Sequence, residues 1–277
     1  MNATNAQSPG TEAAPRSVEK VMEIKAPVEA VWKALTEADE LTRWFPLQAK
    51  ATPGVGGKIW VSWGAPIEGE SEIQIWEPNR RLKTTWPFAE GHGTMGGVVL
   101  TVDYLLEAKG GTTTLRLVHS GFGHGADWDT QYDSVRQGWD FELRGMRHYL
   151  ENHLGTPRRV IWSRRPVKTS VEATWQVVLG SKGLGALAAI QGAKSGAAYA
   201  FTSPEGTHYE GKLDLFNPPK QFSATVAGLN NAYLLIQAEA CGGAPEVWMW
   251  MNTYGVAEEV CRRVQGEWDG MLARLLT

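Results

Sequence analysis

Cysteine is scarce in this chain of 277 residues, which contains only Cys241 and Cys261. Two cysteines cannot form a disulfide framework, and neither stands in a CxxC or Cys/His spacing. Such usage is typical of a reducing compartment, so we expect a cytoplasmic protein. No charge of one sign dominates, because 27 Lys and Arg face 30 Asp and Glu and the net charge is -3. Without a basic field, the sequence predicts no nucleic-acid partner.

Long hydrophobic runs are also missing, since no stretch approaches the roughly 18 consecutive apolar residues that span a bilayer. We therefore expect no membrane insertion. Residues 1–16 lack the basic segment followed by an apolar stretch that marks a secretory signal. They are interpreted as a flexible tail.

Recognisable catalytic motifs are absent, since neither GxSxG nor HExxH occurs and no nucleophile pair can be assembled from the sequence. This leans against an enzyme without excluding one, and no cofactor is expected. His119, His124, Asp127 and Asp129 form a loose His/carboxylate group whose spacing fits no metal motif. One of the two aspartates is expected to cap a helix. We therefore predict no metal site.

Tryptophan is abundant, with 13 residues, and the hydrophobic period changes along the chain. An opening strand over 18–25 precedes a helix from Val28 and a short helix over 38–44. From Gln48 the period is two, and Gly and Pro separate six further strands. The order predicts an α+β domain whose final helix covers a curved antiparallel sheet. That helix runs to about residue 154 on an apolar stripe of Tyr132, Val135, Trp139, Leu143, Met146, Leu150 and Leu154.

The second half of the chain repeats the first. Residues 28–41 and 171–184 share five identities in fourteen, and Pro78 pairs with Pro218 in a later block. Two tandem copies of one fold explain this pattern. We predict a domain over 17–155 and a degenerate second domain over 156–277.

Four blocks occur in order between Val18 and Leu154: APVEAVWKALTEADELTRWF, WEPNRRLKTTW, TTTLRLVHSGFG and GWDFELRGMRHYLENHL. They resemble the START-like helix-grip superfamily (SRPBCC), most closely its branch of homologues of the activator of heat-shock-protein ATPase. The resemblance implies a seven-stranded antiparallel sheet gripping the C-terminal helix, with a cavity between them that often holds an apolar or aromatic small molecule. It implies no fixed reaction, because one fold supports many functions.

Candidate ligand contacts fall on the sheet and on the long helix. His119 ends a strand on the same face as Leu115 and Leu117, so we expect it to face the cavity, where a histidine serves as anchor or as acid and base. Gly138 and Gly145 each destabilise the helix by about 1 kcal/mol relative to Ala, which indicates close approach of either the sheet or a ligand. The predicted ligand-binding residues are Trp44, Phe45, Trp63, Trp86, Tyr104, Arg116, His119, Gly138 and Trp139.

In the second copy, VWMWMN places Trp248, Trp250 and Asn252 on one face of a strand. Aligned with Leu115, Leu117 and His119, these side chains are expected to fill the second cavity. The second domain is thus predicted to be mainly structural, in a monomeric pseudo-dimer or a homodimer. The opposite face, with Val247, Met249 and Met251, is the expected interface.

Three functions stay open. The leading hypothesis is binding of an apolar or aromatic small molecule in the first domain. The second is a cyclase or hydratase in which His119 moves protons, which requires a titrating, accessible histidine. The third is a co-chaperone-like module that binds a protein partner, which requires a large exposed patch and no open cavity.

Overall fold

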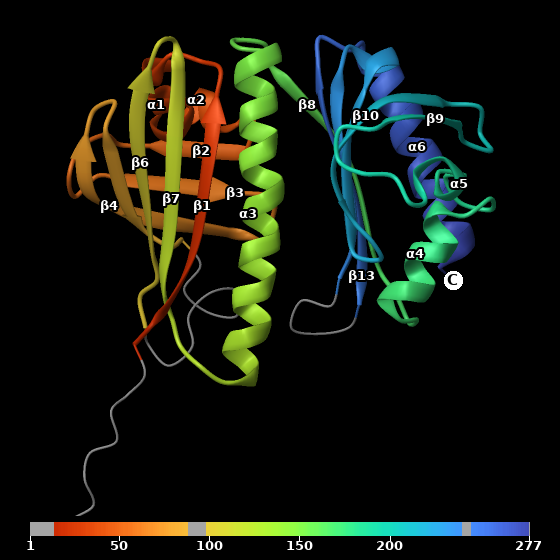
Figure 1. Ribbon diagram of the computed structural model, residues 1–277, viewed down its shortest axis with the longest axis horizontal. Helices are drawn as coiled ribbons and strands as arrows, with labels where there is room; N and C mark the ends of the chain where they lie inside the picture. Colours follow the sequence, from red (N-terminus) through yellow and green to blue (C-terminus); the bar gives the residue numbers. More distant parts are fainter. Residues whose placement is uncertain (1–13, 88–97, 240–244, 277) are drawn as a thin grey trace, which may run out of the picture.

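The structure is a computed structural model that describes residues 14–87, 98–239 and 245–276. Two antiparallel sheets lie side by side with the long helix α3 between them (Figure 1). This arrangement confirms the predicted α+β class and the pair of helix-grip domains. Most of the predicted tail over 1–16 lies outside the described residues, and the exact domain boundary near residue 155 stays a prediction.

The first sheet has seven strands in the order β1-β7-β6-β5-β4-β3-β2, so each strand after the first pairs with its neighbour in sequence and β1 closes onto β7. The six strands predicted after Gln48 are all present. The elements of this domain are β1 (Arg16–Ile24), α1 (Val28–Thr36), α2 (Ala38–Leu41), β2 (Gln48–Ala51), β3 (Lys58–Ser62), β4 (Glu68–Glu77), β5 (Arg81–Thr85), β6 (Thr101–Lys109), β7 (Thr112–Phe122) and α3 (Ala126–Asn152).

Helix α3 begins without the expected aspartate cap. Its N-cap is Gly125, whose φ of 109° leads the chain sharply into the helix, and Asp129 pairs instead with Arg16 at 2.6 Å. The predicted stripe is buried at Trp139, Leu143, Met146 and Leu150. Leu154 lies beyond the helix end and is exposed, because His153 already caps the helix.

The second sheet has six strands in the order β8-β13-β12-β11-β10-β9. This is the first domain's connectivity without an equivalent of β2, as a degenerate repeat predicts. The elements are β8 (Arg158–Pro166), α4 (Val171–Leu179), α5 (Leu187–Ile190), β9 (Ala198–Thr202), β10 (His208–Asn217), β11 (Gln221–Val226), the 3-10 turn η1 (Ala227–Leu229), β12 (Ala232–Glu239), β13 (Glu246–Tyr254) and α6 (Glu258–Leu275).

The two faces of β13 are used the other way round from the prediction. Met249 and Met251 pack in the second domain's own core, which includes residues of α6. Trp250 belongs to a separate cluster with Tyr233 and with Phe141 of α3, at the junction with the first domain. The expectation that the methionine face forms the interface is therefore wrong. The alignment was one residue out of register, and a one-residue slip in a strand exchanges its faces.

Helix α3 thus packs against both sheets. Its Phe141 ring stacks on Tyr233 with centroids 6.0 Å apart, and Gly145 lies closest to the Asn252 amide of the second domain. A Cβ added at Gly145 would make only an ordinary contact, 3.7 Å from Nδ2 of Asn252, so the close approach predicted at this glycine is wrong. No helix among the described residues is long and apolar enough to cross a membrane.

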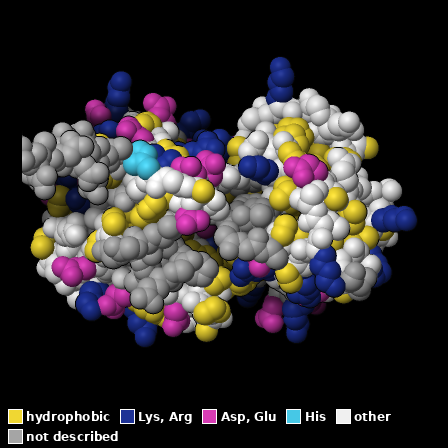
Figure 2. Space-filling model, turned by 90° about the horizontal axis from the view of Figure 1, so that it is seen from below, with side chains coloured by type: hydrophobic (Ala, Val, Ile, Leu, Met, Phe, Trp, Pro, Cys, Tyr) yellow, Lys and Arg dark blue, Asp and Glu magenta, His cyan; other side chains and the backbone are white. Residues whose placement is uncertain are grey.

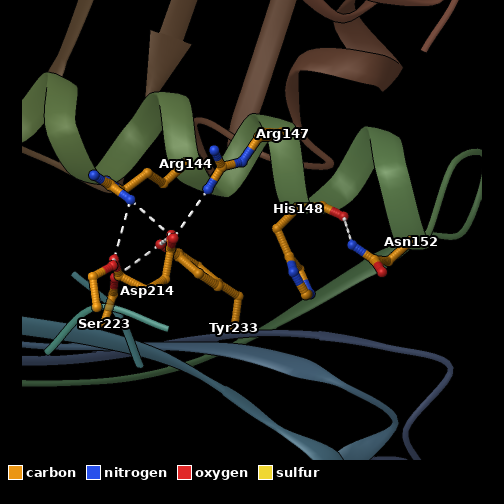
Figure 3. Close-up of polar contacts among 8 residues, drawn as sticks. Arg144, Arg147, His148, Asn152, Asp214, Ser223 and Tyr233 are labelled. Carbon is orange, nitrogen blue, oxygen red and sulfur yellow. Dashed lines mark hydrogen bonds and ion pairs between the residues drawn. The ribbon is translucent and has the colours of Figure 1, made fainter. Parts of the chain in front are cut away.

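A polar network beside this apolar junction also joins the domains (Figure 3). Asp214 on β10 accepts hydrogen bonds from Arg144 at 2.9 Å, from Arg147 at 3.0 Å and from the Tyr233 hydroxyl at 2.8 Å. Both arginines lie on α3. One second-domain carboxylate therefore holds two arginines that lie one turn apart on the first domain's long helix.

Candidate functional site: an aromatic cavity at the domain junction

A cavity of about 270 Å³ opens where α3, the β3–β4 connection and β13 meet. It is slightly smaller than pockets for drug-sized ligands, which measure about 300 to 1,000 Å³. Five of the predicted ligand residues line it, and the second domain contributes one wall. The lining residues are Phe45, Trp63, Ile67, Trp86, Ser134, Val135, Gly138, Trp139, Glu142 and Trp248.

One face of α3 forms the floor of this junction cavity. Val135, Gly138, Trp139 and Glu142 recur at spacings of three and four, so they share a side of the helix. A Cβ added at Gly138 would meet nothing within 4 Å. The alternative that Gly138 allows close packing against the sheet is therefore wrong, and this glycine leaves open space above the helix.

The opposite walls come from connections of the first sheet. Phe45 follows α2, and Trp63 follows β3 at a tight turn in which its backbone N–H donates to the Ile67 carbonyl at 2.9 Å. The Phe45 ring meets Trp63 edge to face at 4.8 Å and stacks on Trp139 at 6.0 Å. Trp86 meets Trp139 at 5.8 Å. These contacts hold the rings in one aromatic wall.

Glu142 is the titratable residue among the described residues that line the cavity. Apolar and aromatic surroundings disfavour its charged form and raise the pKa of the carboxyl to about 8, although the nearby Arg158 guanidinium acts in the opposite direction. Burial also disfavours the charged form of Arg158, and for this basic group it lowers the pKa. The cavity therefore contains an acid that changes its charge close to neutral pH.

His119 lies behind the aromatic wall and not on the cavity surface. It is fully buried, and its Nδ1 accepts a hydrogen bond from the Trp139 indole N–H at 3.1 Å. The remaining ring proton must then reside on Nε2, which has no hydrogen-bond partner among the described residues. Burial lowers the pKa of His119 to about 3, so the ring is neutral at physiological pH.

A second, smaller space of about 40 Å³ lies inside the first domain, between the sheet and the segment of α1 and α2. Trp44 and Tyr104 line it, together with Phe45, Trp86 and mostly aliphatic side chains. Trp44 is a sealed core residue whose indole donates to the Ala34 carbonyl at 2.8 Å. Neither Trp44 nor Tyr104 lines the junction cavity.

Arg116 lies on the wrong face for a ligand anchor. It points outward from β7, between the inward-facing Leu115 and Leu117, and pairs with Glu19 at 2.7 Å. Both partners are about half exposed. Strand alternation alone excludes Arg116 from the face that carries His119, so the expectation of an anchor there is wrong.

Five of the lining residues are not among the predicted ligand contacts, and two of them, Glu142 and Trp248, matter for the chemistry of the cavity. Glu142 stands three residues after Trp139, so helical spacing was enough to place it on the same face. Trp248 was assigned to the second domain's interior through the alignment that was one residue out of register. No group of three or more His, Cys, Asp or Glu side chains suited to a metal occurs in the part of the chain that the structure describes.

Charged residues surround this region without one sign prevailing. On the face shown in Figure 2, basic and acidic side chains are interspersed over both domains. A wider groove of about 860 Å³ on the other side of α3 is lined by both signs, including Lys25, Glu151, Arg147 and Asp214. The predominantly aromatic wall therefore distinguishes the junction cavity from this groove.

Comparison with known proteins gives one family match. The family described as "Activator of Hsp90 ATPase homolog 1-like protein" matches residues 25–151. These residues lie in the first domain and include most of the junction cavity's wall. A search of curated proteins found no match.

Several solved structures are similar to one or both domains. Protein MLL2253 from Mesorhizobium loti is 26% identical over 50% of this chain and 98% of its own, with a TM-score of 0.43. DynU16, from the dynemicin biosynthetic locus, is 20% identical over 93% of this chain and 96% of its own, with a TM-score of 0.43. The di-domain ARO/CYC BexL, from the BE-7585A biosynthetic pathway, is 12% identical over 94% and 95%, with a TM-score of 0.40.

Proposed function

Residues 25–151 match the Activator of Hsp90 ATPase homolog 1-like family, and from that premise we propose that this protein binds an aromatic small molecule in the junction cavity. The second domain completes the site by supplying Trp248. The observation that carries the proposal is the convergence of five aromatic side chains on one open space of about 270 Å³. Aromatic walls with few polar groups are typical of small-molecule sites.

The energetics favour a flat, mostly apolar ligand. Each aromatic pair formed with a ligand ring contributes about 0.5–1.5 kcal/mol beyond the burial of area. The rings are already held by contacts with one another, so little side-chain freedom is lost on binding. The cavity is therefore suited to binding without large rearrangement.

Acid and base catalysis by His119 has less support. A general base must reach the proton that it removes, directly or through one water. His119 is fully buried behind Trp139, and its pKa of about 3 keeps it neutral without making it a useful base for an accessible substrate. The arrangement instead suits a structural role in which His119 orients the Trp139 ring.

A protein-interaction role also has less support than ligand binding. The large hydrophobic side chains exposed among the described residues are few, and all but the adjacent Val98 and Val99 stand apart in the sequence: Val21, Val55, Val98, Val99, Leu154 and Val177. Singly scattered residues of this kind are normal on protein surfaces.

Binding can be tested with the full chain and 1-naphthol, a neutral two-ring probe. We expect saturable quenching of tryptophan fluorescence with a stoichiometry near one per chain, since one cavity of this type is proposed. Native mass spectrometry of freshly purified protein, followed by denaturation, would detect a ligand retained from the cell. An absence of saturable binding by 1-naphthol and by a panel of one- and two-ring compounds would refute the proposal.

A further inference from the structure

The junction cavity combines two features that a purely apolar site does not need. Aromatic side chains form most of its wall, and a carboxyl group, that of Glu142, faces the same space. The charged form of an acid is unfavourable in aromatic surroundings unless a partner compensates it, because the charge loses its hydration there. We therefore expect the partner of Glu142 to be a group bound inside the cavity.

The nearest internal cation does not neutralise Glu142 by direct contact. Arg158 directs its hydrogen bonds to the carbonyl oxygens of Phe45 and Pro46 and to Oδ1 of Asn252. None of the ion pairs found among the described residues includes Glu142, although α3 contributes several others. The carboxylate is left available to a group inside the cavity.

Indole rings attract cations to their faces because the ring quadrupole is negative there, and tryptophan is the strongest of the aromatic residues in this respect. Trp63, Trp86, Trp139 and Trp248 all line the cavity that Glu142 faces. A positive charge held among them would meet ring faces and a carboxylate at once. No other side chain in the described lining carries a charge that would repel it.

We propose that the junction cavity selects a small organic cation, an amine or quaternary ammonium compound, whose charge lies against Glu142 and the tryptophan rings. This inference rests on the proposed function, because it names the class of ligand for the same site. It goes beyond that function in assigning Glu142 the role of specificity determinant.

The proposal connects binding to proton release. The groups that act on Glu142 are Arg158 from β8, which favours its ionised form, and the buried Tyr104 from β6, which stays neutral because burial raises its pKa. With a pKa of about 8, the empty site is mostly protonated at neutral pH. A cation favours the ionised form, so its binding expels the proton.

The test uses benzyltrimethylammonium and its uncharged isostere neopentylbenzene, which differ by one nitrogen in place of one carbon. Dissociation constants for the full chain are measured by tryptophan fluorescence at pH 9. In wild type the cation is bound, and in Glu142→Gln the ratio of the two affinities shifts against the cation by about tenfold or more. Asp133→Asn, which removes an exposed acid from the same helix, leaves the ratio unchanged.

A pH series on the wild type gives an independent measurement should Glu142→Gln fail to fold. Affinity for the cation falls as the pH drops below about 8 and levels off near the affinity of the uncharged site, while affinity for the isostere stays constant. An affinity ratio independent of both pH and Glu142 would overturn the proposal. Binding of 1-naphthol without any binding of the cation would overturn it while leaving the proposed function intact, whereas no binding of any of the three probes would overturn both.

Discussion

The Trp139 indole donates its hydrogen bond to Nδ1 of His119 at 3.1 Å, and this bond joins the sheet of the first domain to the floor of the junction cavity. His119 ends up fully buried on β7, with Trp86 and Phe122 at ring distances of 4.5 and 4.8 Å. The histidine that sequence alone marks as the candidate catalytic group is therefore better understood as a support for a binding wall.

This burial predicts how stability responds to acid. Between the ordinary pKa of 6.5 and the folded value of about 3, the unfolded state takes up a proton at His119 that the folded state does not. The free energy of unfolding therefore falls as pH drops below about 6.5, by up to about 1.4 kcal/mol per pH unit from this residue. Asn at position 119 keeps an acceptor near the Trp139 indole but does not titrate.

We expect urea denaturation of His119→Asn between pH 7 and 4.5 to show a shallower acid slope than wild type. His148 and His153, whose pKa values are also lowered by burial, titrate in both proteins and cancel in the comparison. His208→Asn, at a half-exposed site, is the control. Parallel slopes for wild type and His119→Asn would contradict the assigned burial.

Gly138→Leu should abolish binding while preserving the fold. A side chain at this position enters open space in the cavity, and replacing a helical glycine also removes about 1 kcal/mol of unfavourable helix propensity. We expect loss of 1-naphthol binding with an equal or higher melting temperature. Gly266→Leu, at an exposed and uncrowded site on α6, gives the same helix effect without touching the cavity. Unchanged binding by Gly138→Leu would show that ligands go elsewhere.

Trp248→Ala tests whether the second domain takes part in binding. Trp248 lies half-buried at the cavity with its ring 5.9 Å from Trp162, so the change removes one wall and leaves the second domain's own core untouched. Loss of one aromatic contact should weaken binding of 1-naphthol by about three- to tenfold. Trp60→Ala, on β3 beside Lys50 and outside the cavity lining, should leave the affinity unchanged. Equal affinities in the two variants would assign the site to the first domain alone.

The architecture of the first domain could be predicted from the sequence because its hydrophobic residues recur with clear periods. Alternation from Gln48 onward and the three-four stripe of α3 predict the six strands and the helix that the structure contains. Trp63, Trp86, Gly138 and Trp139, which the sequence groups as neighbours of one space, all line the junction cavity. Periodicity cannot give the size of a cavity, since the 270 Å³ at the junction and the 40 Å³ inside the first domain depend on side-chain packing between distant elements.

The packing between the two domains could not be predicted from the sequence, for a different reason. A repeat aligned by residue identity does not fix strand register, and Met249 and Trp250 are exchanged by a shift of one. Since β13 is buried on both faces, its hydrophobic pattern carries no alternation that would reveal the error. Glu142 was missed because a charged residue on a helix is usually solvated, whereas here it is half-buried in a cavity lined by residues of both domains.

Asp214 is expected to be a main determinant of how the two domains hold together. Its carboxylate accepts from Arg144 and Arg147 of the first domain and from Tyr233 of its own, at a site where all three charged side chains are less than one-third exposed. Asp214→Asn keeps the shape but leaves two arginines without a counter-charge, and its single amide oxygen replaces the two carboxylate oxygens that accept from the arginines and from the Tyr233 hydroxyl. We expect a loss of about 1–3 kcal/mol in the free energy of unfolding.

A double-mutant cycle with Arg144→Met and Asp214→Asn measures the interaction energy between these two side chains. If the two groups stabilise the junction by interacting with each other, the double variant loses less free energy of unfolding than the two single variants lose together. This difference shrinks in 1 M salt. Glu70→Gln, in an exposed pair with Lys58, should leave the free energy of unfolding nearly unchanged, because solvent screens such pairs. Additive losses in the cycle would mean that the apolar cluster of Phe141, Leu235 and Trp250 holds the domains together without help from the charges.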